Sequence, residues 1–96
     1  LLDSTLIIWM GEFGRTPLIN PGTGRDHWPN SWATVLCGGG INGGQAYGKT
    51  SASGMEVTEN PTSVADFMAT VVRGLGIDHE KQNNSNVGRP IRIVDK

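Results

Sequence analysis

The chain has 96 residues, and its eight basic and nine acidic side chains give a net charge of −1. A protein that binds nucleic acid through its phosphates needs an excess of Lys and Arg, so this balance argues against nucleic acid as a partner. The single cysteine excludes an internal disulfide, and no apolar run approaches the ~20 residues that span a bilayer.

The first predicted element is a strand at residues 6–10, whose sequence LIIWM is apolar and rich in β-branched residues. Such a run is typical of a strand that is buried on both faces in a parallel sheet. Residues 11–29 have no hydrophobic period and contain several prolines and glycines, which predicts a long loop. A second buried strand is predicted at residues 32–37, where the sequence is WATVLC.

The second half of the chain contains the clearest helical pattern. Residues 46–57 are ambiguous and are compatible with a small hairpin. Further on, apolar side chains recur at helical spacing and make one face: Val64, Phe67, Met68, Val71, Val72 and Leu75. Thr62 or Ser63 can cap the start of this helix, and Gly76 can adopt the left-handed conformation that ends one.

The end of the chain is predicted to contain a polar linker at residues 78–88 and an edge strand at residues 90–94. The order of strand, loop, strand, loop and helix predicts an α/β fold. Because the chain begins without Met and apolar strands lie near both of its ends, we expect it to be a fragment of a larger domain.

Residues 43–50, GGQAYGKT, match the P-loop pattern G-x-x-x-x-G-K-[ST] of nucleotide hydrolases. A P-loop needs a strand that runs directly into the loop and a helix that begins within it, because amide groups at the helix start hold the phosphates. Here the predicted strand ends well before Gly43, and the residues after Thr50 have no apolar stripe. The dinucleotide pattern at Gly38, Gly40 and Gly43 lacks its helix for the same reason. We therefore interpret the stretch as a glycine-rich turn.

The candidate site lies upstream of that turn. Glu12 follows the first predicted strand, at the edge where α/β sheets build their sites, and its carboxylate needs Arg15 as an ion-pair partner or a metal ion. Asp26 and His27 supply one oxygen and one imidazole nitrogen, a mixture that suits zinc, manganese or iron. Alternatively, Asp26 and His27 are a structural pair in which the carboxylate orients the imidazole. Arg15 and Arg25 would attract an anionic phosphate or sulfate ester.

Five stretches resemble the C-terminal part of the bacterial domain of unknown function 1501 family and together cover essentially the whole chain. They are GEFGRTP, GRDHWP, GGGINGGQAYGKTS, PTSVADFMATVVRGLGID and GRPIRIVDK. That family is grouped with the alkaline phosphatase and sulfatase superfamily. The resemblance therefore implies that residues 1–96 are a single partial domain, the C-terminal portion of an alkaline phosphatase-like parallel sheet with flanking helices.

The resemblance also carries implications for the site. It places Glu12 at the carboxylate of the superfamily's first metal motif and His27 at its loop histidine, whereas Phe13 stands where the phosphatases carry a ligand histidine. It implies a divalent metal ion, either zinc, manganese or calcium, a small anionic substrate, and the rest of the parent domain as a partner. The nucleophile of such enzymes lies upstream, so no catalytic nucleophile is expected in this chain. Family members commonly begin with a twin-arginine signal, which implies an exported or periplasmic parent.

Three hypotheses follow. The first is a metal-dependent hydrolase of phosphate or sulfate esters. The second is a non-catalytic exported domain that keeps the fold for binding or assembly. The third, and least favoured, is a P-loop nucleotide hydrolase.

Overall fold

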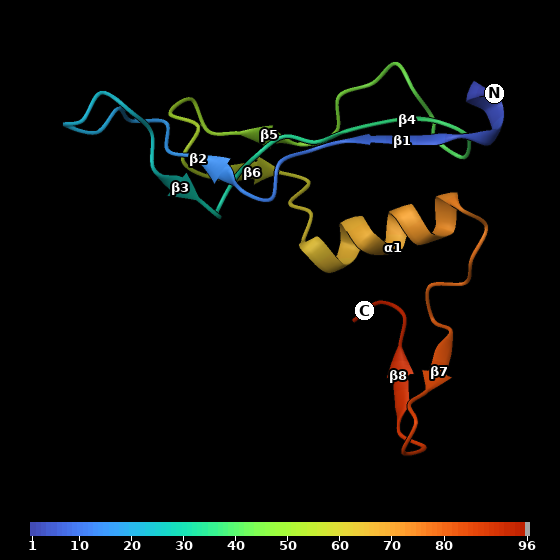
Figure 1. The fold of residues 1–96 in the computed structure, drawn as a ribbon. Coiled ribbons are helices and arrows are strands. Elements are labelled where there is room, and N and C mark those ends of the chain that lie inside the picture. Colours follow the sequence, from blue (N-terminus) through green and yellow to red (C-terminus); the bar gives the residue numbers. More distant parts are fainter. Residues whose placement is uncertain (96) are drawn as a thin grey trace. The chain divides into compact units, whose positions relative to one another are not determined.

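The structure, a computed structural model, describes residues 1–95. The chain divides into two compact units, and Figure 1 shows their helices and strands. Unit 1 comprises Leu1–Leu6, Gly38–Asn42 and the described part of Thr62–Lys96, and unit 2 comprises Ile7–Cys37 and Gly43–Pro61. The described residues contain both α and β structure, as the sequence predicts.

Unit 1 contains the 3-10 helix η1 (Leu2–Ser4) and the α-helix α1 (Val64–Gly74). The predicted start of α1 is confirmed, because Ser63 is the N-cap and forms a capping box with Asp66. The predicted end is also confirmed, since Gly76 has a φ of 77°. No helix among residues 1–95 is both long enough and apolar enough to cross a membrane.

We expect the capping box to stabilise α1. The Ser63 hydroxyl accepts a hydrogen bond from Asp66 N at 3.1 Å, so Ser63→Ala is expected to lower the free energy of unfolding by about 1 kcal/mol. Thr70→Ala is the matched control: it removes a hydroxyl that donates to the Asp66 carbonyl, but it does so inside the helix, where alanine is preferred. Chemical unfolding of the two variants checks this, and equal losses would contradict the capping role.

The core of unit 1 is small and lies on one side of α1. Ala69, Val72 and Val94 form a buried cluster, so the segment after the last strand packs against the helix. The predicted apolar face of α1 is only partly covered, since Val71 and Val72 are buried whereas Leu75 is 59% exposed. The other residues of unit 1 therefore cover only part of the apolar face of the helix.

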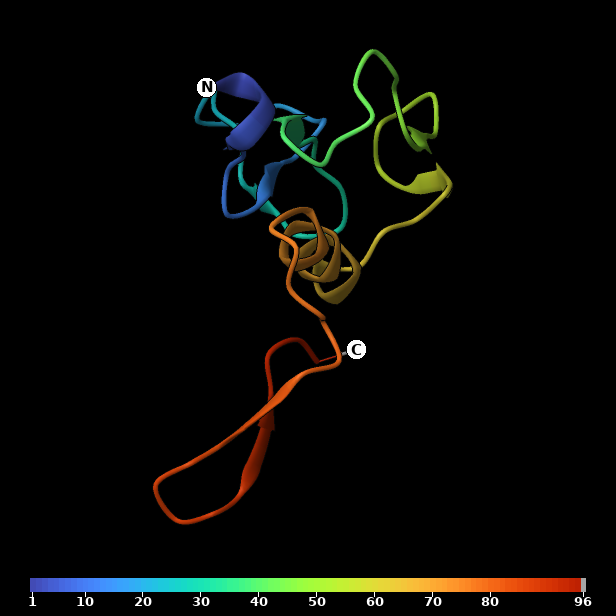
Figure 2. The same ribbon diagram turned by 90° about the vertical axis from the view of Figure 1, so that its right-hand side faces the viewer.

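The end of the chain forms an antiparallel hairpin of β7 (Gln82–Asn84) and β8 (Pro90–Arg92), which projects away from α1 in Figures 1 and 2. The final strand is confirmed, but the linker prediction is wrong at residues 82–84. Both strands are exposed on both faces, so no apolar alternation marks them in the sequence. Backbone pairing defines the register of the hairpin, and the Ser85 hydroxyl accepts a 3.1 Å hydrogen bond from the Arg89 amide in its turn.

The glycine-rich turn begins at Gly38, the last residue of β4 (Val35–Gly38). Gly38 has a φ of +96°, a conformation that favours glycine, and a Cβ there would overlap the carbonyl oxygen of Thr5. The next amide, of Gly39, donates a 2.9 Å hydrogen bond to that same oxygen. The turn therefore needs glycine because it closes tightly on the backbone at Thr5.

Unit 2 is built from short strand pairs. β1 (Leu6–Trp9) is hydrogen bonded to β4, and two antiparallel hairpins are formed by β2 (Gly14–Arg15) with β3 (His27–Trp28) and by β5 (Lys49–Thr50) with β6 (Val57–Glu59). The β5–β6 pair shows that the ambiguous residues 46–57 take part in a small hairpin, which extends to Glu59. The loop prediction for residues 11–29 is wrong at β2 and β3, because two-residue strands are too short to show a period.

Strand β1 exists as predicted, but its predicted burial is wrong. Ile7, Ile8 and Met10 are exposed, and Trp9 is 77% exposed. Unit 2 contains no helix among its described residues, so no helical layer of its own covers either face of the β1–β4 pair.

Candidate functional site

The β2–β3 hairpin brings the predicted site residues of the two motifs together. Its register pairs Gly14 with Trp28 and Arg15 with His27. At the next position the Thr16 amide donates to the Asp26 carbonyl at 3.0 Å, so Arg15 and His27 form a non-hydrogen-bonded pair. In such a pair the Cα atoms are about 4.5 Å apart and the two side chains leave the same face. The sequence motifs GEFGRTP and GRDHWP therefore meet across one hairpin.

Three side chains share this face, which we call the hairpin face: Phe13, Arg15 and His27. The rings of Phe13 and His27 have centroids 3.9 Å apart and planes tilted by 34°. The Arg15 guanidinium carbon lies 5.4 Å from the centre of the Phe13 ring, a cation–π distance. Arg15 and His27 are exposed and Phe13 is half-buried, so the aromatic ring lies beneath a cation and an imidazole.

The other side of the hairpin is packed rather than open. Gly14 is buried, and a Cβ there would overlap the Ser31 carbonyl oxygen and lie 2.9 Å from both the Trp28 oxygen and the Trp32 Cβ. The indole N–H groups of Trp28 and Trp32 are buried, and neither has a hydrogen-bond partner among residues 1–95. Of the two faces of the β2–β3 pair, the hairpin face is therefore the more open one in the described part of the chain.

Arg25 ties the loop between the two strands. Its Nη1 donates short hydrogen bonds to the carbonyl oxygens of Thr16, at 2.8 Å, and Pro17, at 2.7 Å. Arg15 makes a longer bond, 3.3 Å from its Nη1 to the Arg25 carbonyl. Both arginines predicted to bind an anion are exposed, but they differ in their hydrogen bonds: Arg25 makes two short bonds to the loop backbone, and Arg15 makes one longer bond on the hairpin face.

The Asp26 carboxylate also makes a hydrogen bond within the loop. Its Oδ1 accepts a 2.9 Å hydrogen bond from Asn20 Nδ2, and the Asn20 side-chain oxygen accepts one from the Gly24 amide at 3.0 Å. The alternative in which Asp26 orients the His27 imidazole is not formed within residues 1–95. Instead, the ring of Phe13 packs against that imidazole.

Glu12 is exposed and lies one residue before Phe13. Arg15 contacts the Phe13 ring and the Arg25 carbonyl rather than Glu12, so the ion-pair alternative is not formed in the described part of the chain. Nor do residues 1–95 gather three or more His, Cys, Asp or Glu side chains closely enough to hold a metal ion. The assignment of Glu12, Asp26 and His27 as metal ligands stays a prediction.

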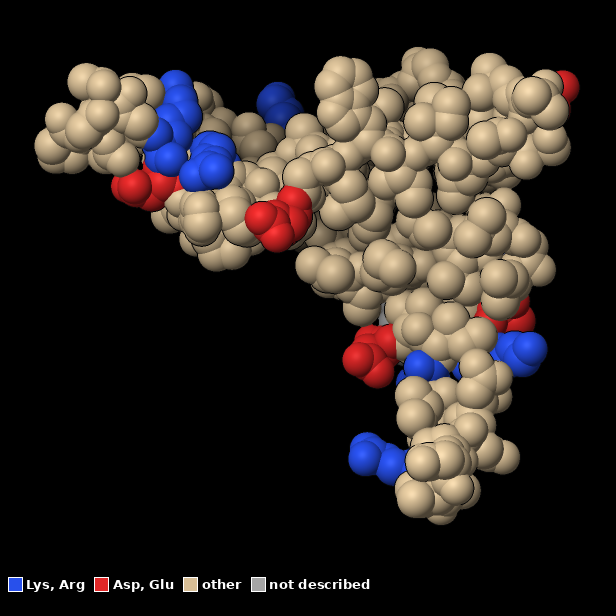
Figure 3. Space-filling view, viewed as in Figure 1, with Lys and Arg blue, Asp and Glu red and all other residues tan. Residues whose placement is uncertain are grey.

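Charge on the visible surface is mixed around this hairpin. In Figure 3, basic and acidic side chains lie next to each other on the part of unit 2 that carries β2 and β3, and the end of the connecting loop carries neither. The sequence of that end, residues 18–23, is LINPGT. The visible face therefore shows a few individual cations here, with no broad basic patch.

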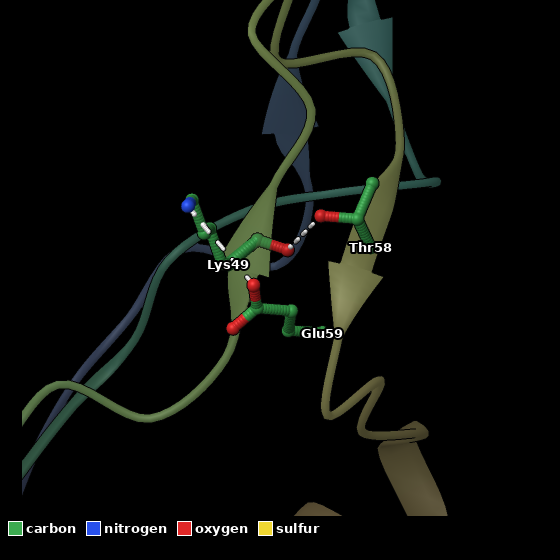
Figure 4. A network of polar contacts seen from close by, with 3 residues as sticks. All are labelled: Lys49, Thr58 and Glu59. Atoms are coloured by element: carbon green, nitrogen blue, oxygen red, sulfur yellow. Dashed lines mark hydrogen bonds and ion pairs between the residues drawn. The ribbon is translucent and has the colours of Figure 1, made fainter.

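The GGQAYGKT stretch has no helix of the kind a P-loop requires, because residues 49–50 form strand β5. Figure 4 shows the surroundings of Lys49: its Nζ lies 4.0 Å from Glu59 Oε1, and the Thr58 hydroxyl donates to its carbonyl at 3.2 Å. The Lys49 and Glu59 side chains are 70% and 64% exposed. Lys49 is therefore a surface residue of a hairpin, as the interpretation of a glycine-rich turn expects.

Lys49→Ala is accordingly expected to change the free energy of unfolding by less than about 0.5 kcal/mol, because exposed ion pairs contribute little. ATP is expected to bind neither wild-type protein nor variant. Isothermal calorimetry with ATP and magnesium checks the second point. ATP binding that Lys49→Ala abolishes would revive the nucleotide hydrolase hypothesis.

A hollow lies beyond the end of α1 in unit 1. It is open, has a volume of about 390 Å³, and is lined by Arg73, Gly76, Ile77, Asp78, His79 and Glu80. Its lining includes one arginine and two carboxylates, and the Asp78 carboxylate accepts a hydrogen bond from the Glu80 amide at 2.9 Å. These contacts are typical of the residues that follow a helix, and they indicate no functional role for His79.

Comparison with protein families identifies the chain. The model of the family "Protein of unknown function (DUF1501)" matches residues 1–96, so the chain belongs to this family. No curated protein and no solved structure matches the chain.

Phe13 and Asn20 are the contacts that sequence reasoning missed as parts of the site. Alternate residues of a strand share one face, so Phe13 lies on the same face as Arg15 and its cross-strand partner His27. This spacing of two residues is the sequence signal for the hairpin face. Asn20 carries no such signal, because its bond to Asp26 depends on the conformation of the loop.

Proposed function

We propose that the chain is the C-terminal part of an exported, alkaline phosphatase-like or sulfatase-like protein that hydrolyses phosphate or sulfate esters with a divalent metal ion. In this proposal the β1–β4 pair belongs to a larger parallel sheet with flanking helices. The β2–β3 hairpin lies at its active site, and the nucleophile comes from the preceding part of the parent.

The hairpin face is the observation that carries the proposal. It places Arg15 and His27 opposite each other in the strand pair, with both side chains against the Phe13 ring, and leaves both exposed. The guanidinium offers several N–H donors to an oxyanion, and the imidazole can bind a metal or transfer a proton. Both kinds of group can assist ester hydrolysis next to the reacting phosphorus or sulfur atom.

The metal ion would be held by Glu12 and His27, with Asp26 as a further ligand. The donor chemistry fits, because carboxylate oxygen and imidazole nitrogen are ordinary ligands of zinc and manganese, and Glu12 and His27 are both exposed. Asp26 fits less well, since one of its oxygens is bonded to Asn20. In the proposal the remaining ligands come from the rest of the parent domain.

A divalent metal ion, when bound, would act as a Lewis acid on the ester oxygens and favour an ionised nucleophile. The residues of this chain would orient the ester: Arg15 binds a non-bridging oxygen, and the stacked Phe13 ring keeps the His27 imidazole in place. The packed side of the hairpin, at Gly14, fixes the backbone from which these side chains extend.

The second hypothesis, a non-catalytic domain for binding or assembly, is favoured by a different observation. The exposed apolar side chains of β1, including Trp9 at 77%, offer a surface that another protein segment would cover. That segment belongs either to another part of the same full-length protein or to a different protein. Only a segment from a different protein would support the binding or assembly hypothesis.

The test is hydrolysis by the full-length protein of p-nitrophenyl phosphate and p-nitrophenyl sulfate, with and without a chelator. The proposal expects turnover of at least one ester, its loss with chelator, and its return with zinc, manganese or calcium. Absence of turnover across these metals would favour the binding or assembly hypothesis.

A further inference from the structure

The two arginines of the hairpin have different hydrogen bonds, and this difference divides their roles. Arg25 Nη1 donates to two backbone carbonyls at 2.7 and 2.8 Å, whereas the bond from Arg15 to the Arg25 carbonyl is 3.3 Å long. Short bonds from a charged donor are the stronger ones. Turning Arg25 toward a ligand would break two of them, and turning Arg15 would break one weak bond.

The neighbours of Arg15 prepare it for an anion. Its cross-strand partner is His27, and the ring of Phe13 lies 5.4 Å from its guanidinium carbon. A guanidinium has five N–H donors, and the bond to the Arg25 carbonyl uses Nη1. The face of an aromatic ring attracts the cation without using any N–H group, so the remaining donors stay available.

Phe13 contacts both functional side chains at once. Its ring lies 3.9 Å from the His27 ring by centroid and also lies under the Arg15 guanidinium. Because the ring is half-buried while the other two side chains are exposed, it limits the directions that they adopt. A smaller, non-aromatic side chain at this position would free both of them.

We propose that Arg15 is the oxyanion-binding residue of this site, that Phe13 is a positioning residue for Arg15 and His27, and that Arg25 holds the 16–26 loop and takes no part in binding. The group bound is a tetrahedral phosphate or sulfate. This inference rests on the proposed function where it identifies that group as part of a substrate ester, but binding of the anion is measurable without turnover.

The experiment is calorimetric titration of the full-length protein with inorganic phosphate and, separately, inorganic sulfate. The matched variants are Arg15→Gln and Arg25→Gln, which remove the same charge from the same hairpin. Arg15→Gln is expected to raise Kd about tenfold or more, the loss of a charge-assisted hydrogen bond. Arg25→Gln is expected to keep Kd within about twofold and to lower the unfolding midpoint instead. The arm with the lower wild-type Kd identifies the preferred anion.

Phe13 is tested by rescue. Phe13→Leu is expected to raise the Kd for the anion, because it removes the aromatic ring. Phe13→Tyr keeps the ring and is expected to have a Kd close to that of the wild-type protein. Near-native circular dichroism of each variant shows that it is folded, and limited proteolysis of the 16–26 loop reports the role of Arg25.

Three results would overturn the inference: no binding of either anion to the wild-type protein, an unchanged Kd in Arg15→Gln, or a folded Arg25→Gln with a Kd raised as much as in Arg15→Gln. These outcomes are distinct from failure of the proposed function. Binding through Arg15 without ester turnover refutes the hydrolase and leaves the assignment of Arg15 intact. If Arg15→Gln leaves ester turnover unchanged, the hydrolase proposal stands and the assignment of Arg15 is refuted.

Discussion

His27→Ala is expected to lower kcat/KM of the full-length protein for its phosphate or sulfate ester at least ~100-fold, because the variant loses a proposed ligand of the metal ion, and loss of a residue that only orients such a ligand already costs about 10–100-fold. The imidazole is exposed on the hairpin face, next to Arg15 and stacked on Phe13, so it is available to a metal ion or a reacting oxygen. Steady-state kinetics with the better of the two p-nitrophenyl esters measure the effect.

The control is His79→Ala, which removes the other histidine of the chain. His79 lines the open hollow beyond α1 in unit 1, among side chains that have no assigned role in catalysis. It is expected to leave kcat/KM within about twofold, as surface substitutions away from a site do. Equal losses in the two variants would show a general effect on folding, and an active His27→Ala protein would remove the hairpin face from the catalytic site.

Gly38→Ala is expected to give the largest loss of stability, about 2–5 kcal/mol. The left-handed φ of +96° costs a non-glycine residue about 1–2 kcal/mol, and overlap of the new Cβ with the Thr5 carbonyl adds about 1–3 kcal/mol. Moving the Thr5 backbone to relieve that overlap would strain the bond that it accepts from the Gly39 amide. Urea unfolding of the variant measures the change.

Gly43→Ala is the matched control for this substitution, in the same glycine-rich stretch. A Cβ at Gly43 meets no atom within 4 Å, and its φ is not in the left-handed region. Alanine there is expected to be neutral within about 0.5 kcal/mol. A Gly38→Ala protein as stable as Gly43→Ala would contradict the close approach of the turn to Thr5.

Helix α1 was predictable because its signals are local. The apolar period, a cap at Thr62 or Ser63 and the glycine at residue 76 all lie within one segment; the structure selects Ser63 as the cap and adds its capping box with Asp66. The hairpins β2–β3 and β7–β8 were not predictable. Their strands have two or three residues each, and their pairing depends on a partner segment rather than on their own composition.

Burial was predicted less well than the elements themselves. The LIIWM sequence predicts a strand correctly, but burial of a strand depends on what covers it, and Trp9 remains exposed. The same holds for Leu75, the residue directly after α1, which belongs to the predicted apolar face and is exposed. An apolar pattern shows which face needs a partner and leaves the partner unspecified.

The residues of the candidate site were identified by type, but their roles were not. The sequence predicted both Arg15 and Arg25 as anion-binding residues, whereas in the structure Arg25 makes two short bonds to loop carbonyls and Arg15 makes one longer bond. It also left open whether Asp26 orients His27, and the bond from Asn20 to Asp26 is a contact of the loop that no local pattern indicates. Such roles depend on side-chain directions, which pairing register and loop conformation decide.

The most direct test of the account is the metal content of the full-length protein, measured by mass spectrometry after purification without chelator. We expect a bound divalent metal in the wild-type protein, its loss in both Glu12→Ala and His27→Ala, and its retention in the control Glu56→Ala, an exposed carboxylate outside the hairpin. Unchanged metal content in Glu12→Ala and His27→Ala would contradict the claim that the GEFGRTP and GRDHWP motifs share a metal ion.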